Sequence, residues 1–179
     1  MGLFEGFPSF IEGRYSLETL IRWGGFQERM VVQGEIWRIP ISIFIHSSWQ
    51  HIGSNLLGLL FLTRRAEKLF GYRRTSIVIL ISEGIFFALV CLIREADIVH
   101  VGISVTIMAL LGLMSSYPYY FYNVIKQPRI SYHWVFLVFV IYIGLFGGGD
   151  RFGHSLGLTT GFIIGYCMLH NSQQQYLKR

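Results

Sequence analysis

Charged residues are scarce in this chain. Only 14% of its 179 residues are charged, whereas 53% are hydrophobic; a soluble domain carries about 25% charged and about 45–50% apolar residues. This shortage of charge, together with a mean hydropathy of +0.49, excludes an ordinary soluble domain and indicates a protein that faces lipid. At about 20 residues for each crossing of a bilayer, the chain has room for five spans and for no separate soluble domain.

Cysteines and metal-binding patterns are also scarce. The two cysteines, Cys91 and Cys167, lie inside apolar runs, which excludes a disulfide framework and is typical of small packing residues. The His-Glu-x-x-His pattern of zinc proteases is absent, and so are the inverted repeats of many transporters. His46 and His51 would lie about 140° apart around a helix, so we expect them not to share a face. We therefore expect no metal site.

The net charge of +5 does not indicate a nucleic-acid partner. A DNA-binding surface needs a basic stripe on a soluble element. Here the basic residues form short clusters between apolar runs, which is typical of cytoplasmic loops that face anionic lipid. The partner expected for these clusters is the lipid bilayer.

Five hydrophobic segments are long enough to cross a membrane. They cover residues 41–63, 76–93, 102–122, 132–149 and 153–171. In hydrocarbon each must be helical, because its backbone has to satisfy its own hydrogen bonds. We therefore predict an all-α, polytopic membrane helix bundle. Its core is expected at residues 41–171, between an outward-facing N-terminal region at 1–40 and a basic cytoplasmic tail at 172–179.

The distribution of Lys and Arg predicts the orientation of the bundle. The loops at 64–75 and 123–131, together with the C-terminal tail, hold nine basic residues, whereas the opposite loops hold only Arg94 and Arg151. Four arginines before residue 40 weaken this bias. We expect the basic loops in the cytoplasm, so the first, third and fifth segments begin on the outer side.

Polar residues gather at that outer level. His51 and Asn55 lie in the outer half of the first segment. Ser104 begins the third segment, and His154 begins the fifth. Polar residues within a membrane usually mark a functional site. A serine hydroxyl needs an adjacent base to become a good nucleophile, and imidazole supplies one near neutral pH, so this set predicts acyl transfer by Ser104 with His154 as the base.

The other polar groups of the segments are expected to form hydrogen bonds. His51 and Asn55 are four residues apart, so they share one helix face, and we expect them to donate hydrogen bonds to the oxyanion. The backbone N–H of Ser104, at a helix N-terminus, is a further donor. For Glu83, inside the second segment, we expect only a protonated carboxyl bonded to a neighbouring helix.

Small residues of the fifth segment explain how the nucleophile and the base can meet. Gly157, Gly161 and Gly165 stand at intervals of four residues. Such a stripe lets two helix backbones approach closely. We expect the stripe to pack against the third segment and to bring His154 within reach of Ser104.

These motifs resemble those of the rhomboid intramembrane proteases. The matching runs are Glu35–Arg38, His46–Asn55, Ala66–Gly71, Gly102–Ser104 and Gly153–Gly157. In order and spacing they cover about residues 20–170, most of the chain. The resemblance implies a six-helix core that cleaves transmembrane protein substrates, in which a serine on the fourth helix is activated by a histidine on the sixth, without metal or cofactor.

The resemblance also assigns residues to roles. Carried over, Ser104 is the nucleophile and His154 its base, with oxyanion contacts from His51 and Asn55. The other matches are structural. Trp37 and Arg38 match a pair in a membrane-embedded first loop, and the later motifs contain His46, Gly102 and Gly157.

Two departures from the family pattern leave an alternative open. The family motif is Gly-x-Ser-Gly, but Val105 follows the nucleophile here, and its branched side chain is expected to crowd the His154 ring or the scissile bond. The five segments match family helices two to six, so we expect the first family helix to be missing. The alternative is a catalytically impaired rhomboid-like pseudoprotease that binds transmembrane helices. In either case we expect a multi-pass protein of a bacterial cell membrane, with its site toward the outer side.

Overall fold

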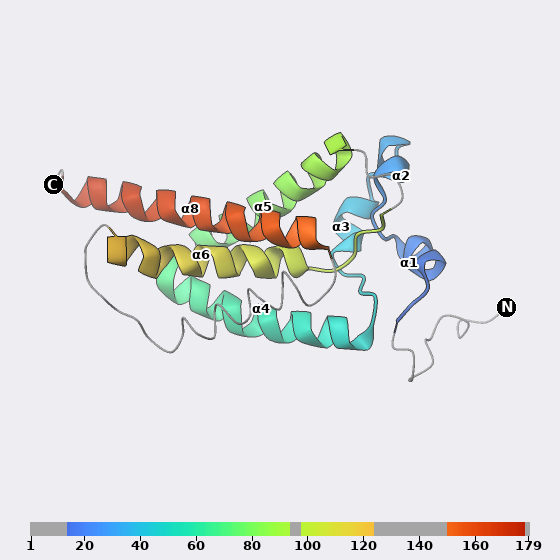
Figure 1. The fold of residues 1–179 in the computed structure, drawn as a ribbon, viewed down its shortest axis with the longest axis horizontal. Helices are drawn as coiled ribbons and strands as arrows, with labels where there is room; N and C mark the ends of the chain where they lie inside the picture. The colour runs from blue at the N-terminus through green and yellow to red at the C-terminus, as the bar shows by residue number, and fades with distance from the viewer. Residues whose placement is uncertain (1–13, 94–97, 124–149, 178–179) are drawn as a thin grey trace. The chain divides into compact units, whose positions relative to one another are not determined.

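The structure, a computed structural model, describes residues 14–93, 98–123 and 150–177. Within these ranges the secondary structure is helical, apart from one isolated antiparallel bridge between Phe26 and His100. The all-α prediction is confirmed for this part of the chain. The helices, coloured along the chain in Figure 1, are α1 (Leu17–Trp23), α2 (Glu28–Val32), α3 (Arg38–Ser42), α4 (Trp49–Phe70), α5 (Tyr72–Ile93), α6 (Ser104–Asn123) and α8 (Arg151–Leu177).

The chain divides into two compact units. The first holds the described residues up to Gly58 together with Phe87–Ile103, and the second holds Leu59–Phe86 together with the described residues from Ser104 onward. The first unit therefore contains the three short helices and the segment that leads to Ser104. The second unit contains α6 and α8. The long helices α4 and α5 contribute residues to both units.

Buried polar contacts hold the first unit together. Arg38 is 6% exposed. Its guanidinium donates to the Glu35 carboxylate at 2.7 Å and to the backbone carbonyls of Ile21 at 2.7 Å and Gly25 at 3.2 Å. It also lies over the Trp37 ring, 4.6 Å from the ring centre. Arg38 thus joins the end of α1 to the start of α3.

The predicted first span begins later than expected. The hydrophobic segment was predicted from residue 41, whereas α4 begins at Trp49 and the short helix α3 ends at Ser42. The Ser48 hydroxyl accepts a hydrogen bond from the His51 backbone N–H at 3.1 Å, which satisfies a donor of the first turn. Ser48 is therefore a helix cap and not a residue inside a span.

The other predicted segments agree with the observed helices to within a few residues at their starts. The segments 76–93, 102–122 and 153–171 correspond to α5, α6 and α8, while 132–149 lies outside the described residues. Among the described helices, α5 and the part Arg151–Ser172 of α8 are long and apolar enough to cross a membrane. Only about a third of the residues in each of these stretches is buried, as expected for helices that face lipid. The number of spans stays a prediction.

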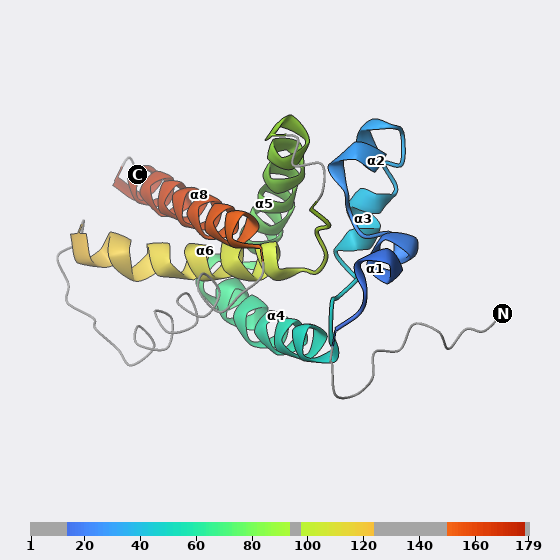
Figure 2. The same cartoon turned by 45° about the vertical axis from the view of Figure 1, so that its right-hand side comes forward.

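The core of the second unit is the contact between α6 and α8. Residues 105–113 of α6 are all buried, and α8 runs along α6 in both views (Figures 1 and 2). A methyl group added at Gly161 would fall on the backbone carbonyl of Ala109, and one added at Gly112 would fall on that of Leu158. The predicted packing of the glycine stripe against the third segment is confirmed.

Candidate active site

Ser104 and His154 lie within hydrogen-bonding distance of each other. The Ser104 Oγ atom is 3.0 Å from the His154 Nε2 atom, although the two residues are 50 positions apart. Ser104 is the first residue of α6, and His154 lies in the first turn of α8. His154 is 9% exposed. With the Nδ1-protonated tautomer, Nε2 accepts the serine proton, which is the geometry of a nucleophile with its general base.

Asp150 fixes the start of the helix that carries His154. Its carboxylate accepts a hydrogen bond from the Gly153 N–H at 2.8 Å, and its backbone carbonyl accepts one from the His154 N–H at 2.9 Å. Asp is a preferred residue at this capping position, so the sequence held a signal for this contact. The cap was not predicted, and it orients the first turn from which the imidazole projects.

Val105 does not hold the Ser104 and His154 side chains apart. Its side chain is 4% exposed, and the Ser104–His154 distance is 3.0 Å with Val105 in place. The Val105 backbone carbonyl lies 2.5 Å from the point that a Cβ on Gly157 would occupy. The missing side chain at Gly157 therefore allows α8 to approach the turn of α6 that carries Ser104.

The first unit places His51 and Asn55 together, as their spacing predicts. A Cβ built on Gly102 would lie 2.9 Å from His51 Cε1 and 3.3 Å from Asn55 Nδ2, so both side chains reach the same glycine. Gly102 has φ = 98°, a conformation that favours glycine, and its N–H donates to the Ser42 carbonyl at 2.9 Å. A larger residue at this position would strain the backbone and displace both side chains.

The side-chain nitrogens of His51 and Asn55 near Gly102 differ in their hydrogen bonds. His51 Nδ1 lies 3.1 Å from the Ser47 hydroxyl; when the hydroxyl donates, the ring proton is on Nε2, which faces Gly102. The Asn55 Nδ2 atom is buried and has no hydrogen-bond partner among the described residues. Buried donors are normally bonded, and this amide is an exception. It can therefore donate to a further acceptor.

A rhomboid domain matches residues 33–171, which is more than half of the chain. The chain belongs to the rhomboid family. RHOMBOID-like protein 5 of Arabidopsis thaliana is 28% identical over 90% of this chain and 53% of its own length. RHOMBOID-like protein 4 of the same plant is 32% identical over 84% of this chain and 39% of its own length. Rhomboid-type serine protease 2 of Emericella nidulans is 28% identical over 83% of this chain and 30% of its own length.

This rhomboid-family membrane protein thus spans about half the length of the first curated relatives that it matches. The matched residues 33–171 include Ser104, His154, His51 and Asn55, as well as the Trp37–Arg38 pair. No solved structure matches the chain significantly.

The first histidine of the rhomboid run, His46, lies closer to His51 than expected. The two ring centres are 5.0 Å apart in an edge-to-face arrangement. The expectation that they do not share a face was wrong, because His46 precedes α4 and is not part of the helix. Among the described residues, no group of three or more His, Cys, Asp and Glu side chains is arranged to hold a metal ion.

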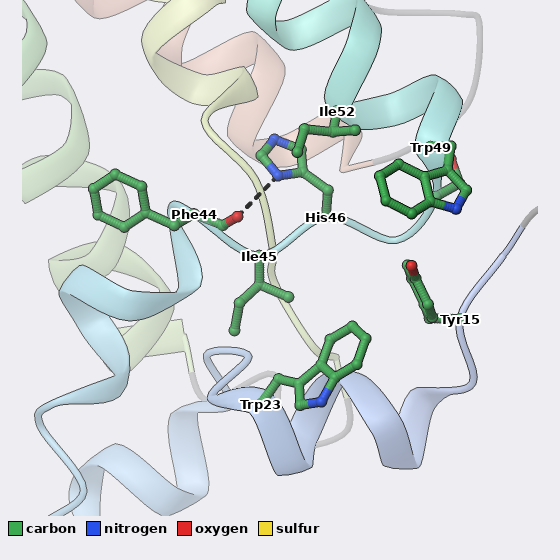
Figure 3. A pocket seen from close by; sticks show the side chains of 8 residues that line it. Tyr15, Trp23, Phe44, Ile45, His46, Trp49 and Ile52 are labelled. Atoms are coloured by element: carbon green, nitrogen blue, oxygen red, sulfur yellow. Dashed lines mark hydrogen bonds between the residues drawn. The ribbon is translucent and has the colours of Figure 1, made fainter. Parts of the chain in front are cut away.

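His46 is one wall of a small cavity in the first unit. The cavity, about 350 Å³ in volume, is lined mainly by apolar and aromatic side chains, among them Trp23, Trp49 and Ile52 (Figure 3). His46 Nδ1 lies 3.0 Å from the Phe44 carbonyl. Burial lowers the pKa of the His46 imidazole, and the hydrogen bond to Phe44 opposes part of that decrease, so the ring is neutral at pH 7 and packs like an aromatic residue.

Proposed function

We propose that this chain is an intramembrane serine endopeptidase that cleaves transmembrane protein substrates with a Ser104–His154 dyad. One observation carries the proposal: the 3.0 Å approach of Ser104 Oγ to His154 Nε2, from the first turns of two different helices. Membership of the rhomboid family and a relative named as a serine protease support it. The activity of the whole protein, its substrates and its orientation with the site toward the outer side are parts of the same proposal.

The proposed reaction uses the side chains of this chain and one water molecule. Ser104 Oγ attacks the scissile carbonyl carbon while His154 Nε2 takes its proton. The imidazolium then protonates the leaving amine. Water attacks the acyl-enzyme with His154 again as the base; the bond to Ser104 Oγ breaks, Oγ takes the proton back from His154, and the carboxylic acid product leaves. Covalent attack places a negative charge on the carbonyl oxygen, which preformed donors must stabilise.

The proposed oxyanion donors are His51 and Asn55. The unbonded Nδ2 of Asn55 supports this role, and so does the approach of both side chains to Gly102. Gly102 stands two residues before Ser104 in the sequence. Removal of one oxyanion donor typically lowers kcat by about 10²–10³-fold.

Labelling by a fluorophosphonate tests the dyad directly. The wild-type protein is expected to be labelled at Ser104, because the probe reacts with a serine that a base activates. His154→Ala is expected to lower the labelling rate by about 10²–10⁴-fold, the usual contribution of a general base. The rate is measured by gel fluorescence, and the labelled peptide is identified by mass spectrometry.

A matched control separates the dyad from other serines near it. Ser155 is exposed and adjacent to His154. Ser155→Ala is expected to keep the wild-type labelling rate, whereas Ser104→Ala is expected to show none. Labelling of equal rate in Ser104→Ala would mean that another residue is the nucleophile.

The second candidate function is a pseudoprotease that binds transmembrane helices without cleaving them. Val105, in the place of the family glycine, favours this alternative. Since the dyad distance is short with Val105 present, we expect Val105→Gly to change kcat by less than about threefold, which is under 1 kcal/mol of barrier. An increase of about 100-fold or more, from a wild-type rate near background, would favour the pseudoprotease. The measurement is cleavage of a transmembrane substrate in liposomes.

A further inference from the structure

The carboxyl group of Glu83 is bonded to the first turn of the helix that carries Ser104. Glu83 lies in the middle of α5 and is 8% exposed. Its Oε1 atom accepts two hydrogen bonds from Thr106, one from the backbone N–H at 3.0 Å and one from the hydroxyl at 2.6 Å. Thr106 is 1% exposed. The expected bond between Glu83 and a neighbouring helix is confirmed, and its partner stands two residues after Ser104.

This contact replaces a helix cap that the local sequence does not provide. The first N–H groups of a helix have no acceptor within the helix, and a side-chain oxygen of the preceding residue usually accepts from the second or third of them. The residue before α6 is Ile103, which has no such oxygen. Glu83 supplies the acceptor from another helix, to the N–H of the third residue of α6.

The nucleophile turn is therefore held on two sides within the second unit. On one side Thr106 is bonded to Glu83 of α5. On the other side the Val105 carbonyl packs closely against Gly157 of α8. Ser104 stands one residue before Val105 and two before Thr106, so both contacts constrain the turn that begins at Ser104.

We propose that Glu83 is a positioning residue for the nucleophile. By bonding Thr106 it holds the first turn of α6 so that Ser104 Oγ stays at hydrogen-bonding distance from His154 Nε2. A carboxyl group inside an apolar helix is costly, and this role gives it a function beyond joining two helices. The expected effect on the reaction rate rests on the proposed protease function. The expected effect on the first turn of α6 rests only on the Glu83–Thr106 hydrogen bonds.

The test compares Glu83→Ala with Glu83→Gln. Alanine removes the acceptor, whereas the glutamine carbonyl oxygen accepts both bonds from Thr106. A misplacement of about 1 Å in a catalytic group costs about 100-fold in rate, so Glu83→Ala is expected to lower kcat by about 30–100-fold with KM changed by less than about twofold. Glu83→Gln is expected to stay within about threefold of wild type. The rates are measured by substrate cleavage in liposomes and by fluorophosphonate labelling of Ser104.

Two further variants keep the test decisive if Glu83→Ala does not fold. Thr106→Val removes only the hydroxyl bond and is expected to lower kcat by about 3–10-fold. Ser82→Ala is the matched control, because Ser82 is buried next to Glu83 and accepts a hydrogen bond from Thr160 of α8 at 3.1 Å. It removes an interhelical bond that does not involve the first turn of α6, so it is expected to lower the melting temperature without changing kcat.

The outcomes separate this inference from the proposed function. If Glu83→Ala and Thr106→Val both keep wild-type kcat and labelling, Glu83 is not a positioning residue and the dyad proposal stands. If Ser82→Ala lowers kcat as much as Glu83→Ala, the effect is general loss of packing and the inference fails. If the wild type neither cleaves nor reacts with the probe, the protease proposal fails. Amide hydrogen exchange at Thr106 then decides whether Glu83 holds the turn, with faster exchange in Glu83→Ala than in Ser82→Ala supporting it and equal exchange overturning it.

Discussion

Ser104→Ala is expected to lower cleavage of a transmembrane substrate by a factor on the order of 10⁴ or more, because it removes the hydroxyl that lies 3.0 Å from His154 Nε2. His154→Ala is expected to have an effect of similar size. Residues that act as a unit are strongly non-additive. The double variant is therefore expected to be no less active than either single variant.

Cleavage is measured by gel analysis of a substrate reconstituted with the protein in liposomes, with its product sites found by mass spectrometry. All variants must first show the wild-type melting temperature in detergent, since an unfolded protein also fails to cleave. Ser155→Ala serves as the active control, because Ser155 is exposed. Full activity in Ser104→Ala would end the dyad assignment.

Gly161→Val is expected to destabilise the second unit by about 3 kcal/mol or more, the upper range for overpacking a core. A Cβ at this position would fall on the Ala109 carbonyl, within a row of backbone contacts between α6 and α8. Backbone atoms cannot rotate away as a flexible side chain does, so the two helices must separate. We expect a large decrease in melting temperature and loss of the Ser104–His154 approach, which thermal unfolding in detergent and probe labelling measure.

Gly84→Ala is the matched control for this change. Gly84 also lies inside a helix of the second unit, but a Cβ there would meet no atom within 4 Å. Alanine favours helix over glycine by about 1 kcal/mol, so this variant is expected to be as stable as the wild type or more so. Equal melting temperatures for Gly161→Val and the wild type would show that α6 and α8 are not in direct backbone contact.

The sequence predicted the features that repeat along a helix. Apolar runs predicted the long helices, because a membrane leaves a backbone no other partner. The interval of four residues predicted which face of α8 meets α6, and the shared level of Ser104 and His154 predicted their meeting, which the 3.0 Å distance shows. The match of residues 33–171 to the rhomboid domain agrees with the family resemblance.

Contacts between distant residues outside the periodic pattern could not be predicted in the same way. Spacing predicted that His46 and His51 lie apart, but a helix cap at Ser48 takes His46 out of the helix and brings the rings together. The partner of Glu83 is 23 residues away, and no local rule connects the two positions. The Asp150 cap could have been predicted from the local sequence, because Asp is a preferred capping residue and stands directly before the first turn of α8.

In the proposed protease, the direct backbone contact between α6 and α8 limits the route by which a substrate reaches Ser104. The contact extends from Gly157 against the Val105 carbonyl to Gly161 against the Ala109 backbone, and over this length the two backbones leave no room for a further chain between the helices. A transmembrane segment therefore cannot enter sideways between them. The bond to be cut has to arrive at the helix ends, where both reacting groups stand in the first turn. A substrate has to present an unwound stretch there, since an intact helix buries its own peptide groups. Resistance of a substrate to local unwinding is then a barrier to its cleavage that acts before any chemistry.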